Sequence, residues 1–168
     1  IVNTCYAATE PSIGLKLNRD DAKYKLYFAD TGLLISHSFD ENEILTDKLY
    51  AKLLLDKIEI NKGMLVENLV AQMFRASGKK LYYYTQSSRD NSEDNIEIDF
   101  LIRKPIVTSR HNICPVEVKS SNNYKTSSLI KFRNKFSQYL HTNYVLHSGD
   151  LKEDNGILYL PLYMAPLL

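Results

Sequence analysis

A chain of 168 residues, of which 44% are hydrophobic and 24% charged, has the size and composition of one compact domain. Its 6 glycines and 5 prolines are too few for a collagen-like, low-complexity or disordered chain. No apolar run approaches the roughly 18 residues of a membrane helix, and Cys5 and Cys114 lack the spacing of a disulfide framework or a zinc site. We therefore expect a cytoplasmic protein with reduced thiols.

The net charge of +1 conceals an uneven distribution. Residues 1–60 contain 7 Lys or Arg and 10 Asp or Glu, whereas residues 61–168 contain 14 and 10. Residues 119–149 contain no acidic residue, and their basic residues are Lys119, Lys125, Lys131, Arg133 and Lys135. A local basic stretch of this kind can attract a polyanion such as DNA even when the whole chain is nearly neutral.

The first 60 residues predict little regular structure before one strand and one helix. Residues 1–22 include Pro11 and Gly14 and are expected to be irregular. Residues 23–29 are aromatic and partly alternating, which predicts a short strand. Residues 41–60 carry apolar side chains at helical spacing and predict a helix.

After residue 63 the pattern predicts a mixture of helices and strands. Helices are expected over residues 64–76 and 126–140, because apolar side chains recur there on one face. Strands are expected over residues 81–85, 96–103, 113–119, 143–147 and 156–160. In residues 96–103 the strict alternation puts Ile96, Ile98, Phe100 and Ile102 on one apolar face.

Two of these strands carry the residues most suited to catalysis. Side chains two positions apart in a strand point to the same side, so Glu117 and Lys119 share a face. Asp99 lies opposite the apolar face of the preceding strand. If the two strands pair as a hairpin, Asp99, Glu117 and Lys119 converge on one spot.

Two carboxylates at one spot repel each other unless a cation lies between them, and Mg²⁺ suits oxygen ligands while keeping several waters. A lysine beside those waters can orient or deprotonate one of them for attack on a phosphodiester. Glu67, on the expected helix 64–76, is a candidate for a further ligand. Mn²⁺ is the alternative metal. If Asp99, Glu117 and Lys119 have no catalytic role, the alternative is a solvated salt-bridge cluster. For Glu67 the alternative to a metal ligand is a carboxylate on the helix surface.

The pattern Asp99…Glu117-Val-Lys119, preceded by a helical Glu67 and followed by a helix, resembles the PD-(D/E)xK nuclease superfamily. The resemblance implies an α/β fold of restriction-endonuclease-like type, with a mixed central sheet flanked by helices and an αβββαβ core. It also implies that Asp99, Glu117 and Glu67 bind Mg²⁺ and that Lys119 assists the attacking water. Ile98 stands where the superfamily pattern has proline.

Residues 23–34, 63–70 and 160–163 resemble one subgroup in particular, the uncharacterised domain at the C-terminus of predicted bacterial and archaeal AAA+ ATPases. This resemblance implies a nuclease-like domain over residues 23–168, preceded in residues 1–22 by a remnant of a winged helix. It also implies a parent chain whose ATPase module and winged helix are partners of this domain and through which it forms oligomers. The sequence contains no phosphate-binding loop of the Walker type.

Three functions therefore remain open. The first is Mg²⁺-dependent hydrolysis of DNA, with Lys125, Lys131, Arg133 and Lys135 contacting the phosphates. The second is a non-catalytic module that binds DNA or protein, and the third is a structural domain that supports assembly of the ATPase. For the four basic residues, the structural interpretation is a solvated helix face.

Overall fold

The computed structural model of the chain describes residues 1–38, 61–88, 94–104, 109–121 and 123–168, and these form an α/β domain. The expected helix over residues 41–60 lies outside the described residues. The helical elements in the described residues are α1 (Thr31–His37), α3 (Lys62–Ala76), α4 (Ser127–Phe136) and the 3-10 helix η2 (Leu162–Leu167). The strands are β1 (Val2–Ala8), β2 (Arg19–Phe28), β3 (Leu81–Gln86), β4 (Ile96–Ile98), β5 (Phe100–Arg103), β6 (Ile113–Val118), β7 (Asn143–His147), β8 (Lys152–Asp154) and β9 (Ile157–Pro161).

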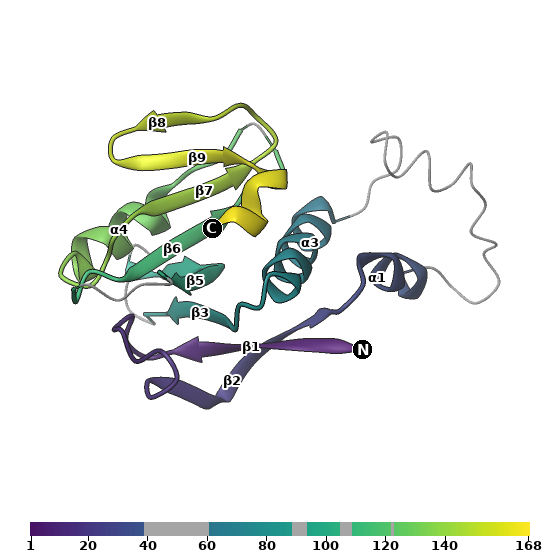
Figure 1. Cartoon of the computed structure of the whole chain (residues 1–168), viewed down its shortest axis with the longest axis horizontal. Coiled ribbons are helices and arrows are strands. Elements are labelled where there is room, and N and C mark those ends of the chain that lie inside the picture. Colours follow the sequence, from purple (N-terminus) through teal and green to yellow (C-terminus); the bar gives the residue numbers. More distant parts are fainter. Residues whose placement is uncertain (39–60, 89–93, 105–108, 122) are drawn as a thin grey trace.

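The described strands form two mixed sheets (Figure 1). In the first, with the order β2-β1-β3-β4, β1 is parallel to β3 and antiparallel to β2. In the second, with the order β5-β6-β7-β9-β8, the central strands β6, β7 and β9 are parallel and both edges are antiparallel. The sequence predicts one central sheet, whereas the described strands form two. The chain passes from the first sheet to the second at Asp99.

Asp99 is a bend between β4 and β5, so the expected strand over residues 96–103 is two strands. Ile98 belongs to one core cluster together with Leu101, whereas Phe100 belongs to the other. The prediction that all the alternate isoleucines and Phe100 share a face is therefore wrong. A single irregular residue in a strand exchanges the faces that the following side chains present.

The sheets are covered by different helices on their two sides. Val70 and Phe74 of α3 pack in the cluster that contains Val116 of β6. Leu129 and Phe132 of α4 pack in the cluster that contains Ile113 of the same strand. Because β6 is buried on both faces, its sequence reads as almost continuously apolar, and a charged residue within it is conspicuous.

Residues 1–22 are not irregular, which corrects the expectation from the sequence. Val2–Ala8 forms β1, which pairs with β2 on one side and β3 on the other, and β2 already begins at Arg19. Cys5 and Ala7 are buried in the cluster under α3. This strand depends on partners distant in the sequence, and local periodicity does not reveal such pairing. The suggestion that these residues end a winged helix stays a prediction.

The other expected elements are present with shifted ends, except β7, which begins and ends where predicted. The hairpin between β8 and β9 turns at Asn155 and Gly156, whose φ angles of 51° and 72° suit an Asn-Gly turn. No helix in the described part of the chain is long and apolar enough to cross a membrane.

Candidate functional site

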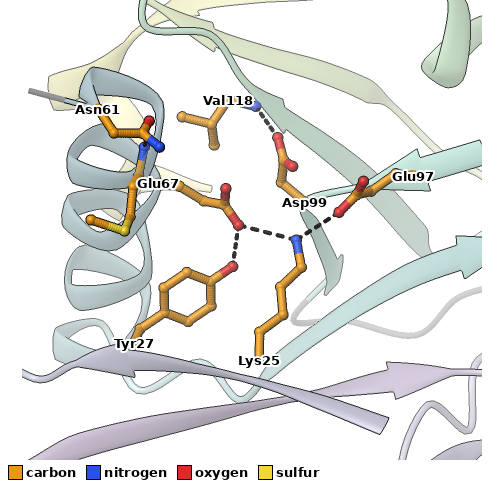
Figure 2. A network of polar contacts seen from close by, with 8 residues as sticks. Lys25, Tyr27, Asn61, Glu67, Glu97, Asp99 and Val118 are labelled. Carbon is orange, nitrogen blue, oxygen red and sulfur yellow. Dashed lines mark hydrogen bonds and ion pairs between the residues drawn. The ribbon is translucent and has the colours of Figure 1, made fainter.

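Asp99 lies where the ends of three strands meet: it follows β4, precedes β5 and contacts the last residue of β6. Its position at the bend turns the carboxylate toward β6, where Oδ2 accepts a hydrogen bond of 2.7 Å from the backbone N–H of Val118 (Figure 2). The pKa of Asp99 is raised to about 7, mainly by burial and further by the nearby carboxylates of Glu67 and Glu117. The Val118 N–H and the Lys25 ammonium act in the opposite direction. The nearby charges of Glu67 and Glu117 therefore make the ionised form of Asp99 electrostatically costly.

Glu117 is the charged residue buried within β6. Only 2% of its side chain is exposed, and Lys119 Nζ lies 2.8 Å from Glu117 Oε2. Burial raises the pKa of Glu117, while Lys119 and the backbone N–H of Leu129, in the first turn of α4, lower it. Neither carboxylate oxygen makes a hydrogen bond of regular geometry within the protein. Glu117 therefore keeps oxygen lone pairs for a further partner.

Glu67 lies beside Asp99 in a network with Lys25, Tyr27 and Glu97 (Figure 2). Lys25 Nζ of β2 lies 3.2 Å from Glu67 Oε1 and 2.9 Å from Glu97 Oε1, and the Tyr27 O–H donates to Glu67 Oε1. Burial disfavours the Lys25 ammonium, but Glu67, Glu97 and Asp99 outweigh it, so the pKa of Lys25 is raised. Lys25 is thus an internal counter-ion for the acidic residues on this side of the bend.

The fit of these residues to a divalent metal differs from the expectation of three ligands. In the residues described here, no three His, Cys, Asp or Glu side chains are grouped so as to hold a metal ion. Glu117 has buried oxygens without regular partners, and one or two carboxylates suffice when Mg²⁺ keeps its waters. Asp99 and Glu117 as ligands of Mg²⁺ stay a prediction. Glu67 as a third ligand stays a prediction, because it contacts Lys25 and Tyr27.

The sequence pattern did not single out Lys25 or Tyr27 as site residues. Lys25 and Tyr27 are two positions apart in β2, so both point toward α3, while the intervening Leu26 is 57% exposed. The period-two pattern of β2 places the two polar residues on one face, but it does not say which face meets α3. That choice depends on the docking of β2 against a helix about 40 residues away in sequence.

The predicted DNA-binding residues of α4 are only partly free for a ligand. Arg133 donates to the backbone oxygen of Asn155, and Lys135 contacts Gln86 and lies 5.0 Å from the centre of the Phe136 ring. Lys125 precedes the helix and is exposed, and Lys131 is half-buried. Their contact with nucleic acid stays a prediction.

Comparison with known proteins identifies one family. The model of the family described as Domain of unknown function (DUF4143) matches residues 62–164, from the first residues of α3 into η2. The match covers more than half of the chain, which therefore belongs to this family. No curated protein and no solved structure gives a significant match.

Proposed function

We propose that this DUF4143 domain is a Mg²⁺-dependent phosphodiesterase that acts on DNA, with a core of restriction-endonuclease-like type. Asp99 and Glu117 would hold the Mg²⁺ or Mn²⁺, which when bound supplies a Lewis acid and lowers the pKa of water. Lys119 would keep the Glu117 carboxylate in place and hold or accept a proton beside the reacting water. We also propose that the domain serves an AAA+ ATPase module and a winged helix of the same parent chain.

One observation carries the proposal, the hydrogen bond that holds Asp99 against the end of β6, the segment that carries Glu117 and Lys119. The backbone N–H that holds Asp99 belongs to Val118, the residue between Glu117 and Lys119. Burial raises the pKa values of both carboxyl groups, and the charge of Glu117 adds to the rise at Asp99. Such buried pairs are costly, and they occur where a cation or a reaction makes use of them. The chain order α3, β3, β4–β5, β6, α4, β7 also agrees with an αβββαβ core when β4 and β5 are counted as one bent strand.

Cleavage of labelled single-stranded, duplex and branched DNA in Mn²⁺ or Mg²⁺ tests the proposal. We expect cleavage by the wild-type chain and at least a ~100-fold loss in Lys119→Ala, as general acid–base groups typically contribute ~10²–10⁴-fold. Lys152→Ala is the matched control, because Lys152 is an exposed lysine on β8. Absence of cleavage by the folded wild type, or equal cleavage by Lys119→Ala, would contradict the proposal.

The arrangement around Glu67 favours a second candidate, a non-catalytic binding or structural module of the ATPase. Lys25 already neutralises Glu67 and Glu97 from within the protein, as expected where carboxylates serve stability. Binding of Mn²⁺, measured by electron paramagnetic resonance, separates the two candidates. The catalytic candidate requires binding that Asp99→Asn abolishes, whereas the non-catalytic one requires none.

A further inference from the structure

A continuous basic groove lies at the C-terminal end of α3, away from the candidate site. It consists of two hollows of about 330 and 520 Å³, which share Lys16, Lys80 and Tyr82 in their walls. Glu67 and Arg75 are separated by eight residues of α3, or about 12 Å along the helix axis. We infer that this groove binds the phosphodiester backbone of DNA, at a surface distinct from the residues proposed to hydrolyse it.

The charged side chains that line the groove are all basic, and they lie among apolar and uncharged residues. No Asp or Glu side chain is among the described residues that line either hollow. The cations come from three segments that are distant in the sequence: the loop before β2 and its first residue, the end of α3 with the following turn, and the end of β5. They are Lys16, Arg19, Arg75, Lys79, Lys80, Arg103 and Lys104.

Several of these cations are available to a ligand. Arg19 forms an ion pair of 2.6 Å with Asp21, but in the described residues no carboxylate lies within ion-pair distance of Lys16, Lys80 or Arg103, and all three side chains are exposed. Tyr82 lines both hollows. Burial raises the pKa of its phenol, whereas the positive charges of Arg19 and Arg103 lower it. The groove therefore concentrates positive charge without an internal neutralising partner for most of its cations.

The distribution of charge favours a polyanion over a single phosphate. A site for one phosphate gathers its donors around one point, whereas these cations are spread along two adjoining hollows. A nucleic-acid backbone presents one negative charge at each nucleotide and is bound by lysine and arginine side chains arranged in this way. The identity of the partner as DNA rests on the proposed function, but the binding itself does not require cleavage.

Fluorescence anisotropy with labelled single-stranded and duplex DNA, in EDTA, tests this inference on the whole 168-residue chain. We expect the double variant Lys80→Gln/Arg103→Gln to bind at least ~10-fold more weakly at about 50 mM salt. The slope of log K against log salt should fall by roughly two units, about one for each side chain that no longer neutralises a phosphate. The matched control is Lys23→Gln/Lys152→Gln, which removes two exposed charges outside the groove and should change affinity less than ~2-fold.

Three outcomes would overturn the inference. They are equal affinity and salt slope in the two double variants, no binding of DNA by the wild-type chain, or tighter binding of polyglutamate than of DNA. Thermal melting of each variant checks that it is folded. If groove-dependent binding is found without any cleavage, the inference stands and the proposed hydrolysis fails. If cleavage is found but the affinity for DNA does not depend on the groove residues, the proposed hydrolysis stands and this inference fails.

Discussion

The ammonium of Lys25 has the environment that a metal ion has in many acidic sites. It lies within 3.2 Å of carboxylate oxygens from α3 and β4, and Asp99 contributes a further negative charge nearby. At the other side of the bend, Glu117 has only Lys119 as a cationic partner among the described residues. Each lysine is therefore the internal counter-ion of the carboxylates nearest to it, Lys25 of Glu67 and Glu97, and Lys119 of Glu117.

Replacing Lys25 by methionine should destabilise the fold by about 2 kcal/mol at pH 7, between the values typical of surface and buried ion pairs. The substitution leaves Glu67 and Glu97 without their shared cation. The pKa of Lys25 is raised on folding, so its contribution is fully present below the ordinary lysine pKa of about 10.4 and is lost at higher pH. Urea denaturation of Lys25→Met and the wild type measures the difference.

The control for that measurement is Lys23→Met, whose ammonium is largely exposed and 3.9 Å from Asp20. We expect it to change the free energy of unfolding by less than about 0.5 kcal/mol. A Lys25→Met variant as stable as this control would show that the acidic residues do not need the ammonium.

At the scale of elements, α3 positions both the candidate site and the strand that carries Lys25. Asn68 of α3 is 2% exposed, and its side chain bonds both backbone groups of Phe28, at 2.7 Å from the N–H and 3.2 Å from the carbonyl oxygen. It also donates to Thr31 Oγ1 at 3.1 Å. One side chain thus docks the end of β2 and the start of α1 against the helix, next to Glu67.

Asn68→Ala should lower the free energy of unfolding by about 2–3 kcal/mol, because it leaves the Phe28 N–H and carbonyl without their side-chain partner. It should also loosen the register that brings Lys25 and Tyr27 to Glu67. Urea denaturation gives the energy, and hydrogen exchange of the Phe28 amide reports the local effect. Asn134→Ala, at an exposed position of α4, is the matched control and should cost less than about 0.5 kcal/mol. Equal stability of the two variants would contradict the docking role.

At the scale of the whole molecule, β1 joins the N-terminal residues to the sheet that leads to the candidate site. It is the central partner of β2 and β3, and β3 in turn pairs with β4, which ends at Ile98, next to Asp99. The match to the DUF4143 family begins only at residue 62, so the strand that carries Lys25 lies outside the matched residues. The described structure therefore makes residues 1–28 part of the same folding unit as the matched region.

A chain that begins at residue 19 should fail to unfold cooperatively, because deletion of β1 leaves β2 without its partner and exposes the edge of β3. The buried Cys5 and Ala7 would also be removed from the core. Thermal denaturation and analytical ultracentrifugation, with the 168-residue chain as reference, measure cooperativity and aggregation. A shortened chain that melts as a cooperative monomer would instead place the domain boundary near residue 23, as the sequence suggests.

The sequence alone determined those features that depend on neighbours in the chain. Apolar spacing predicted α3, α4 and most strands. These predictions succeed because the periods of helices and strands are local properties of the backbone. The α/β class follows from the same pattern. The role of Asp99, Glu117 and Lys119 in a common site stays a prediction.

Only the tertiary structure decided which faces and partners those elements take. The bend at Asp99 reverses the strand's faces, and the non-local pairing of β1 brings the N-terminal residues into the first sheet. Docking of β2 on α3 gives Glu67 the partner Lys25, and the basic groove gathers cations from segments as distant as residues 16 and 104. Each of these features depends on contacts between residues far apart in the chain, whose free energy no local pattern of side chains records.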